Sequence, residues 1–103
     1  MDLNDIVNLS DTAAALPQAW RSQLLGQVGT ARLKVLRMDE LPLEEETHAG
    51  AEALLVLDGR LELLLGDREV TVGQGELVCV PAGTRHAVRA GSEGTLVLLE
   101  VAD

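Results

Sequence analysis

Residues 75–86 read GELVCVPAGTRH, and they predict a strand, a tight turn and a histidine in close succession. The apolar residues from 77 to 80 are typical of a strand. Pro81 and Gly83 come next, and these residue types suit a tight turn. We therefore predict a β structure in which this turn places His86 at a strand end.

Glycines recur on both sides of this stretch and divide the chain into segments as long as short strands. In one such segment Leu61, Leu63 and Leu65 alternate with other residues, which is the two-residue period of a strand. The dipeptides Asp58-Gly59 and Gly66-Asp67 predict tight hairpin turns, because glycine tolerates a positive φ. Several hairpins in so short a chain predict an all-β sandwich or barrel. The dividing glycines are at positions 59, 66, 73, 75, 83 and 91.

Two continuous apolar runs interrupt the alternation: LLVL at residues 54–57 and LVLL at residues 96–99. Such runs are typical of strands that are buried on both faces. The second face of these strands would be covered by another sheet of the same chain or by a partner subunit. From the latter possibility we expect a homodimer.

The first 29 residues differ from the rest, because they are rich in alanine and lack the glycine rhythm. We predict an N-terminal arm at residues 1–29 and a β-barrel at residues 30–103, together one domain. Ser10 or Asp11 is expected to cap a helical turn that ends before Pro17, since the residue before a proline avoids the helical conformation. Trp20 is expected to pack against apolar groups rather than to recognise a cofactor.

Length and composition exclude several classes of protein. A chain of 103 residues suffices for one domain, and no apolar run approaches the roughly 20 residues of a membrane helix. Eight basic and seventeen acidic residues give a net charge of −9, and Trp20 is the only aromatic residue, so binding to nucleic acid or to an anionic membrane is not expected. One cysteine allows no intrachain disulfide, and the acidic N-terminus does not resemble a signal peptide, so we expect a cytoplasmic protein.

His48 and His86 are the only histidines, and each lies beside a turn signal. Glu46 and His48 leave the same face of an extended chain, and Glu52 follows at the start of the next strand. Two carboxylates and an imidazole suit iron, manganese, nickel or zinc, and His86 would complete four ligands. On spacing alone, however, a solvated loop histidine is the more common explanation.

Residues 75–86 resemble the second sequence motif of the cupins, G-x5-P-x-G-x2-H, and every signature position is met. The first cupin motif reads H-x-H-x3 or x4-E-x6-G. Glu52 and Gly59 match its second half, and His48 falls on its second histidine. The resemblance covers residues 32–101.

The sequence departs from the cupin pattern at three positions. Glu46 stands in place of the first histidine, Glu40 in place of the glycine that often opens the first motif, and Ala90 in place of the asparagine that commonly ends the second. A one-residue gap would instead align Thr47 with the second histidine and leave the first motif without imidazoles. We prefer the ungapped alignment.

The resemblance implies a small double-stranded β-helix, the cupin jelly-roll barrel, that holds a divalent transition metal. The ligands carried over are His48, Glu52 and His86, with Glu46 as the candidate fourth. Arg85 is a candidate for binding an anionic group of a substrate. A surface ion pair is nevertheless the more common role of such an arginine.

Two classes of function remain open, because cupin barrels host enzymes, storage proteins and ligand sensors alike. The first is a metal-binding pocket for a small polar or anionic molecule, as in a metal-dependent enzyme. The second is a metal-free ligand-binding, sensor or interaction module with a degenerate metal site. In that case Glu52 is expected to carry a proton, since an isolated charge inside an apolar barrel is costly. Cys79 is expected to be a small packed residue and not a nucleophile.

Overall fold

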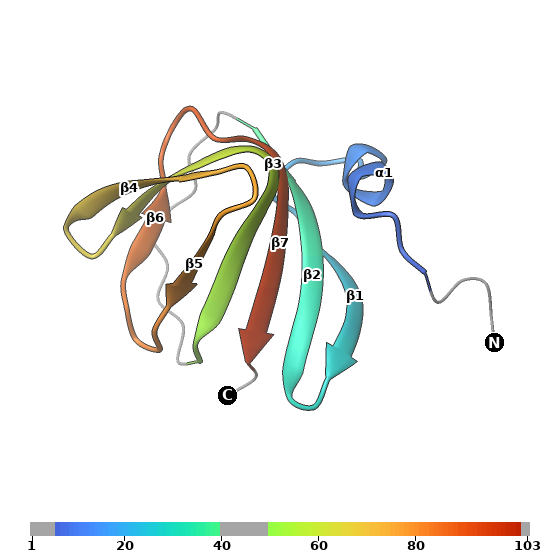
Figure 1. The fold of residues 1–103 in the computed structure, drawn as a ribbon, viewed down its shortest axis with the longest axis horizontal. Helices are drawn as coiled ribbons and strands as arrows, with labels where there is room; N and C mark the ends of the chain where they lie inside the picture. Colours follow the sequence, from blue (N-terminus) through green and yellow to red (C-terminus); the bar gives the residue numbers. More distant parts are fainter. Residues whose placement is uncertain (1–5, 40–49, 102–103) are drawn as a thin grey trace.

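Antiparallel strands make up most of the fold, which confirms the all-β prediction. The computed structural model describes residues 6–39 and 50–101, and these form one short helix and seven strands (Figure 1). The elements are α1 (Leu9–Ala14), β1 (Gln23–Val28), β2 (Ala31–Met38), β3 (Glu52–Leu65), β4 (Arg68–Gly73), β5 (Leu77–Val80), β6 (His86–Val88) and β7 (Glu93–Val101).

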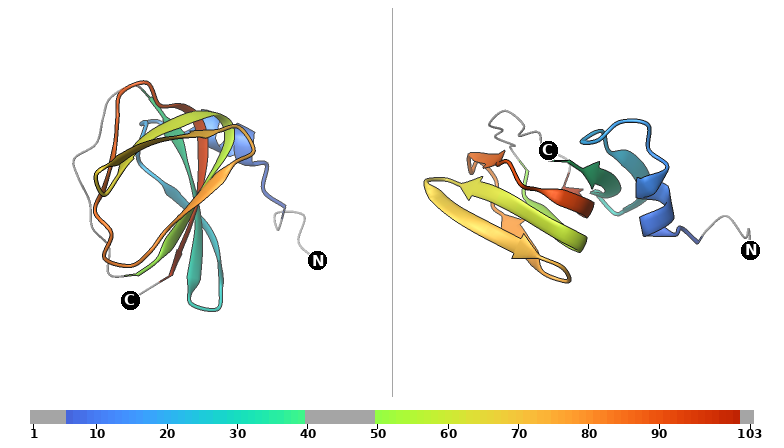
Figure 2. Two further views of the ribbon diagram at one scale, coloured as in Figure 1. Left: turned by 60° about the vertical axis from the view of Figure 1, so that its left-hand side comes forward. Right: turned by 90° about the horizontal axis from the view of Figure 1, so that it is seen from above.

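The long strand β3 connects the two parts of the sheet. The strand order is β1-β2-β7-β3-β4, and β5 and β6 also pair with β3. Residues 52–55 of β3 lie between β5 and β7, whereas residues 60–65 pair with β4 and residues 63–65 also pair with β6. Because the two ends of β3 pair with different strands, the sheet curls around a common interior (Figure 2).

The core lies inside this curl and is built from aliphatic side chains. Leu61 and Leu63 alternate as predicted and are fully buried, and the two-residue hairpin turn at Gly66-Asp67 joins β3 to β4 as predicted. The core cluster consists of Leu36, Met38, Leu54, Val56, Leu61, Leu63, Val72, Val80 and Leu96.

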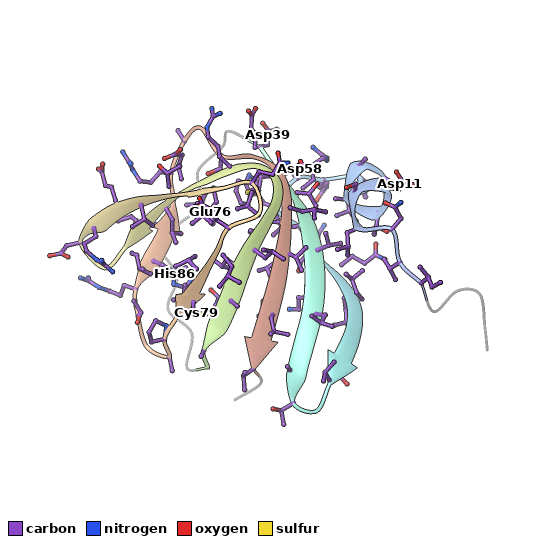
Figure 3. The ribbon with its side chains drawn as sticks, in the orientation of Figure 1. Asp11, Asp39, Asp58, Glu76, Cys79 and His86 are labelled. Carbon is purple, nitrogen blue, oxygen red and sulfur yellow. The ribbon has the colours of Figure 1, made fainter. Side chains whose placement is uncertain are left out.

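The predicted hairpin at Asp58-Gly59 was wrong, because β3 runs through these residues without reversing. The strand bends there, and its pairing with β7 shifts register between Val56 and Asp58. Asp58 lies at this bend (Figure 3), where its carboxylate accepts a hydrogen bond from the backbone N–H of Thr95 at 3.1 Å. An Asp-Gly pair serves a bulge as well as a turn, because both need a residue with positive φ.

The N-terminal segment is more regular than predicted. The helix begins at Leu9, and its cap is Asn8, whose side chain accepts a hydrogen bond from the Asp11 N–H at 2.9 Å. Residues 23–28, which we expected in the arm, form β1 and pair with β2. Trp20 packs against the core cluster, as expected. In the part of the chain that the structure describes, no helix is long and apolar enough to cross a membrane.

The face of the sheet that points away from the core is also apolar. Because side chains alternate along a strand, residues 97, 99 and 101 of β7 share this face with residues 53 and 55 of β3. The helix α1 packs against one part of β2 and β7, and apolar side chains remain exposed elsewhere. Those on this face are Val28, Leu77, Leu99 and Val101, with exposed fractions of 68%, 59%, 38% and 46%.

Candidate metal and ligand site

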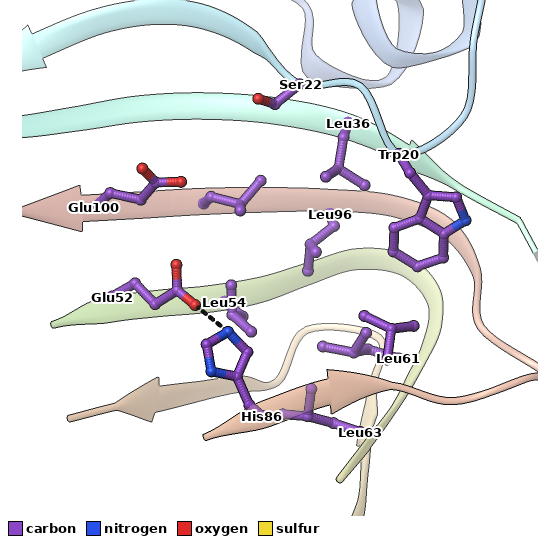
Figure 4. Close-up of a pocket in the computed structure, with 12 residues that line it drawn as sticks. Trp20, Ser22, Leu36, Glu52, Leu54, Leu61, Leu63, His86, Leu96 and Glu100 are labelled. Carbon is purple, nitrogen blue, oxygen red and sulfur yellow. Dashed lines mark ion pairs between the residues drawn. The ribbon is translucent and has the colours of Figure 1, made fainter. Parts of the chain in front are cut away.

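A pocket of about 190 Å³ opens on the inner face of the sheet, between β2, β3, β6 and β7 (Figure 4). Its polar groups lie toward one end and its aromatic group, Trp20, toward the other. The polar lining residues are Ser22, Glu52, His86 and Glu100. The apolar lining residues are Trp20, Leu36, Leu54, Leu61, Leu63, Val88, Leu96 and Leu98.

His86 reaches the pocket because of the turn that precedes it. Gly83 has a φ of +76°, a conformation that side-chain-bearing residues rarely adopt, and the Thr84 N–H donates to the Pro81 carbonyl at 3.2 Å. The chain then enters β6, where His86 pairs with Leu65 of β3. As predicted from the sequence motif, the turn places His86 at the end of a strand.

The His86 ring is held in one orientation by its backbone. Its Nδ1 lies 3.0 Å from the Thr84 carbonyl oxygen, and because a carbonyl only accepts, we assign the proton of this bond to Nδ1. The other ring nitrogen, Nε2, is therefore the one that faces the pocket. A histidine whose second N–H donates to a backbone carbonyl is the usual arrangement of a metal ligand.

Glu52 and His86 form a buried pair inside the pocket. Glu52 Oε1 lies 3.0 Å from His86 Nε2, and both side chains are only 6% exposed. Glu52 is the first residue of β3 and His86 is the first residue of β6, so the two residues come from different strands. A shared proton fits this distance. A metal ion in octahedral coordination fits it too, because two donors about 2.1 Å from one ion and at a right angle lie about 3.0 Å apart.

A second ion pair lies beside the first. Glu100 of β7 is directly opposite Glu52 of β3 in the strand register and lines the same pocket. Lys34 of β2 shares the inner face with Leu36, and its Nζ donates to Glu100 Oε2 at 3.2 Å. The side chains of Lys34 and Glu100 are 23% and 30% exposed, so this pair lies nearer to solvent than Glu52 and His86.

The structure brings together two of the predicted metal ligands, Glu52 and His86. The other two, Glu46 and His48, lie outside the described residues. Within residues 6–39 and 50–101, no three metal-ligating side chains form a cluster that could hold an ion. Arg85 is exposed and does not line the pocket described above, so its role in substrate binding stays a prediction.

Cys79 does not pack as expected. It lies on β5 opposite Ala53, on the outer face of the sheet, and is exposed (Figure 3). The short strand β5 is covered on its inner side only, where Val80 is buried. Apolar neighbours in the sequence therefore indicated a strand correctly, but not which face of it is covered.

Sequence reasoning missed Glu100, Lys34 and the place of Trp20 in the pocket. Glu100 and Lys34 meet Glu52 only through the pairing of β2, β7 and β3. One signal was available: Lys34 is the only lysine of the chain, and it interrupts an apolar strand pattern. Trp20 has a φ of +68°, which its sequence context does not predict.

The fold and the two motifs define a class, the cupins, and comparison with known families agrees. Residues 38–102 match the family model of the cupin domain. The chain therefore belongs to the cupin domain family, and the expected jelly-roll architecture is confirmed.

Known proteins similar to this chain include one curated enzyme. It is quercetin 2,3-dioxygenase of Bacillus subtilis (strain 168), 41% identical over 59 residues, which span 55% of this chain but only 17% of the enzyme. Similar solved structures include a cupin-2 domain protein from Shewanella frigidimarina, with a TM-score of 0.85 and 22% identity, covering 95% of this chain and 96% of the other. A protein from Neisseria meningitidis has a TM-score of 0.81 and 21% identity, with 94% and 99% covered.

Proposed function

We propose that the pocket holds a divalent transition metal and binds a small polar or anionic molecule beside it. The observation that carries this proposal is the buried Glu52–His86 pair, with its 3.0 Å separation and its ring orientation fixed by the Thr84 carbonyl. Glu52 and His86 would hold the ion, with His48 and Glu46 as the further ligands. A carboxylate and imidazole set of this kind suits iron, manganese, nickel or zinc.

The residues of the chain provide binding and exclusion of water around that ion. When bound, the metal would supply a positive charge that polarises an oxygen atom of a small molecule. The Thr84 carbonyl keeps the imidazole in place, and the leucine walls keep water away from the rest of the molecule. More specifically, we propose that the protein is a metal-dependent enzyme, and the partial similarity to a dioxygenase supports this proposal.

A metal-free binding or sensor module is the second candidate function. It is supported by Glu46, which stands in place of a cupin histidine, and by the pairing of Glu52 with His86, which satisfies both groups through a shared proton. In this alternative the pair is a structural hydrogen-bonded pair, and the pocket binds its ligand through Lys34, Glu100 and the leucines alone.

Substitution of either histidine tests the proposed site. We expect His48→Ala and His86→Ala each to abolish stoichiometric metal, because each removes one imidazole ligand. Metal content is measured by elemental mass spectrometry after purification without chelator, and circular dichroism checks that the β structure persists. Arg85→Ala is the control, since it changes the residue next to His86 without removing a ligand. Retention of metal by both histidine variants would rule out the site.

We propose further that two copies of the chain associate through the outer face of the sheet. Four apolar residues are exposed there, on strands β1, β5 and β7 of the one sheet: Val28, Leu77, Leu99 and Val101. The residues of this face are uncharged along β5 and from residue 95 to residue 101 of β7, so two chains of net charge −9 meet with least repulsion there. A second copy, with the same uncharged face, is the partner that fits it.

The dimer is tested with Leu99→Asp. A charge in the centre of an apolar interface is expected to weaken association by roughly 30-fold or more, the effect of losing about 2 kcal/mol. Light scattering coupled to gel filtration, over a range of concentrations, measures it. Leu24→Asp is the control, because Leu24 is similarly exposed but pairs with Lys34 and so lies on the opposite face. A monomeric wild type, or a Leu99→Asp variant as dimeric as the wild type, would contradict the proposal.

A further inference from the structure

The pocket has a polar end and an apolar end, and this division constrains its ligand. Glu52, His86 and Glu100 lie toward one end, while leucines and Trp20 form the remaining walls (Figure 4). An apolar protein cavity of about 150 Å³ accommodates benzene. The volume of about 190 Å³ therefore fits an apolar group about as large as one benzene ring, with room for one polar head group.

The cation nearest to the polar lining residue Glu100 is Lys34, which does not itself line the pocket. Its Nζ is 3.2 Å from Glu100, which lines the pocket, and its side chain is 23% exposed. A lysine ammonium has three donors, and Glu100 uses one of them. Glu100 is the one acceptor found for Lys34 within residues 6–39 and 50–101, so the ammonium can donate its other N–H groups to a ligand, and Glu100 holds it beside the polar end of the pocket.

The charges at the polar end favour an anion when a metal is bound. The proposed ligands Glu46 and Glu52 balance the two charges of a divalent ion, and Glu100 balances Lys34, so these charges sum to zero. Arg32 adds a further cation, because it is exposed and directly opposite Glu100 in the register of β2 and β7. A head group with one negative charge complements this arrangement, and a cationic head group does not.

We propose that Lys34 binds the carboxylate of a small monocarboxylic acid whose apolar body, about the size of a benzene ring, lies against the leucines and Trp20. The inference rests on the proposed function, since the charge sum includes the metal. In this arrangement Lys34 determines the class of ligand, and Glu100 is a positioning residue that fixes the ammonium. The ligand is thus an amphipathic carboxylic acid rather than a sugar or an amine.

The test compares three probes of equal size: benzoate, benzyl alcohol and benzylamine. Hexanoate with hexanol serves as a second, unbranched pair. Binding is measured by titration calorimetry and by the fluorescence of Trp20, which is the only aromatic residue and lines the pocket. The variant is Lys34→Met, which keeps the apolar stem but removes the charge. Arg89→Met is the control, because it removes an equal charge from a surface ion pair with Glu69.

We expect the wild type to prefer the carboxylates, and Lys34→Met to bind them roughly tenfold or more weakly, as for the loss of a charge-assisted hydrogen bond. Binding of benzyl alcohol is expected to stay the same in all three proteins. Equal binding of benzoate by wild type and Lys34→Met, a preference for benzylamine, or no binding of either carboxylate would overturn the inference.

Metal content, measured on the same samples, separates this inference from the proposed function. If the protein contains stoichiometric metal but the Lys34→Met variant binds the carboxylates as well as the wild type does, only the inference is overturned. Absence of metal together with Lys34-dependent binding of benzoate would overturn the metal proposal and support the carboxylate site. Absence of both would overturn both.

Discussion

Gly59→Ala is expected to prevent stable folding, because the added methyl group would overlap the backbone of β7. Gly59 has a φ of +82°, and a Cβ built on it meets the carbonyl oxygen of Glu93. Gly59 pairs with Gly94, whose φ is +102° and whose Cβ would meet the carbonyl of Asp58 in the same way. Neither backbone can move away without breaking the pairing of β3 and β7, so we expect a loss of more than about 3 kcal/mol.

Gly66→Ala is the matched control for this prediction. Gly66 also has a left-handed backbone, with a φ of +62°, but a Cβ there meets nothing within 4 Å. The cost is therefore the conformational one alone, about 1 kcal/mol. Urea unfolding followed by circular dichroism measures both variants. If Gly59→Ala unfolds at the same urea concentration as Gly66→Ala, the close approach of β3 and β7 is not as described.

Substitution of either residue of the buried Glu52–His86 pair is expected to have the second large effect on the free energy of unfolding. It is measured on protein that a chelator has freed of metal. His86→Leu leaves the buried Glu52 carboxylate without its imidazole partner, and Glu52→Leu leaves the imidazole without its carboxylate. Each single variant is expected to lose about 2–3 kcal/mol of unfolding free energy. The double variant is expected to recover most of this loss, because leucines can extend the leucine-lined walls of the pocket.

A double-mutant cycle in urea isolates the interaction of the two residues. We expect a coupling free energy above about 1.5 kcal/mol, since the two side chains are in direct contact and almost fully buried. Lys34 and Glu100 form the comparison cycle, as their more exposed pair is expected to couple by less than about 1 kcal/mol. Additive effects of Glu52→Leu and His86→Leu would show that the contact is not made in solution.

The local features of the fold could be predicted from the sequence. The stretch at residues 75–86 determines its own turn, so the place of His86 at a strand end followed from Pro81 and Gly83. The Gly66-Asp67 hairpin followed for the same reason. Asp58-Gly59 could not be resolved in this way, because a turn and a bulge use the same residues, and only the pairing with β7 distinguishes them.

The site could be predicted only where a motif carried it. Glu52 and His86 belong to the two cupin motifs, and the structure brings them to 3.0 Å from one another. Glu100 and Lys34 lie far from both motifs in the sequence; the register of β2, β7 and β3 brings Glu100 into the pocket and Lys34 beside Glu100. Which face of a strand is covered is likewise a property of the whole sheet, and for this reason Cys79 was placed wrongly.

The central claim is that Glu52 and His86 bind a divalent metal, and the metal-to-protein ratio of a Glu52→Gln variant tests it most directly. This change keeps the size of the side chain and removes the charge of the ligand. The control is Glu69→Gln, which makes the same change at an exposed surface ion pair. Proteins purified without chelator and dialysed against iron, manganese, nickel or zinc are measured by elemental mass spectrometry. We predict about one ion per chain in wild type and Glu69→Gln and almost none in Glu52→Gln; equal metal in all three, or none in the wild type, would contradict the account.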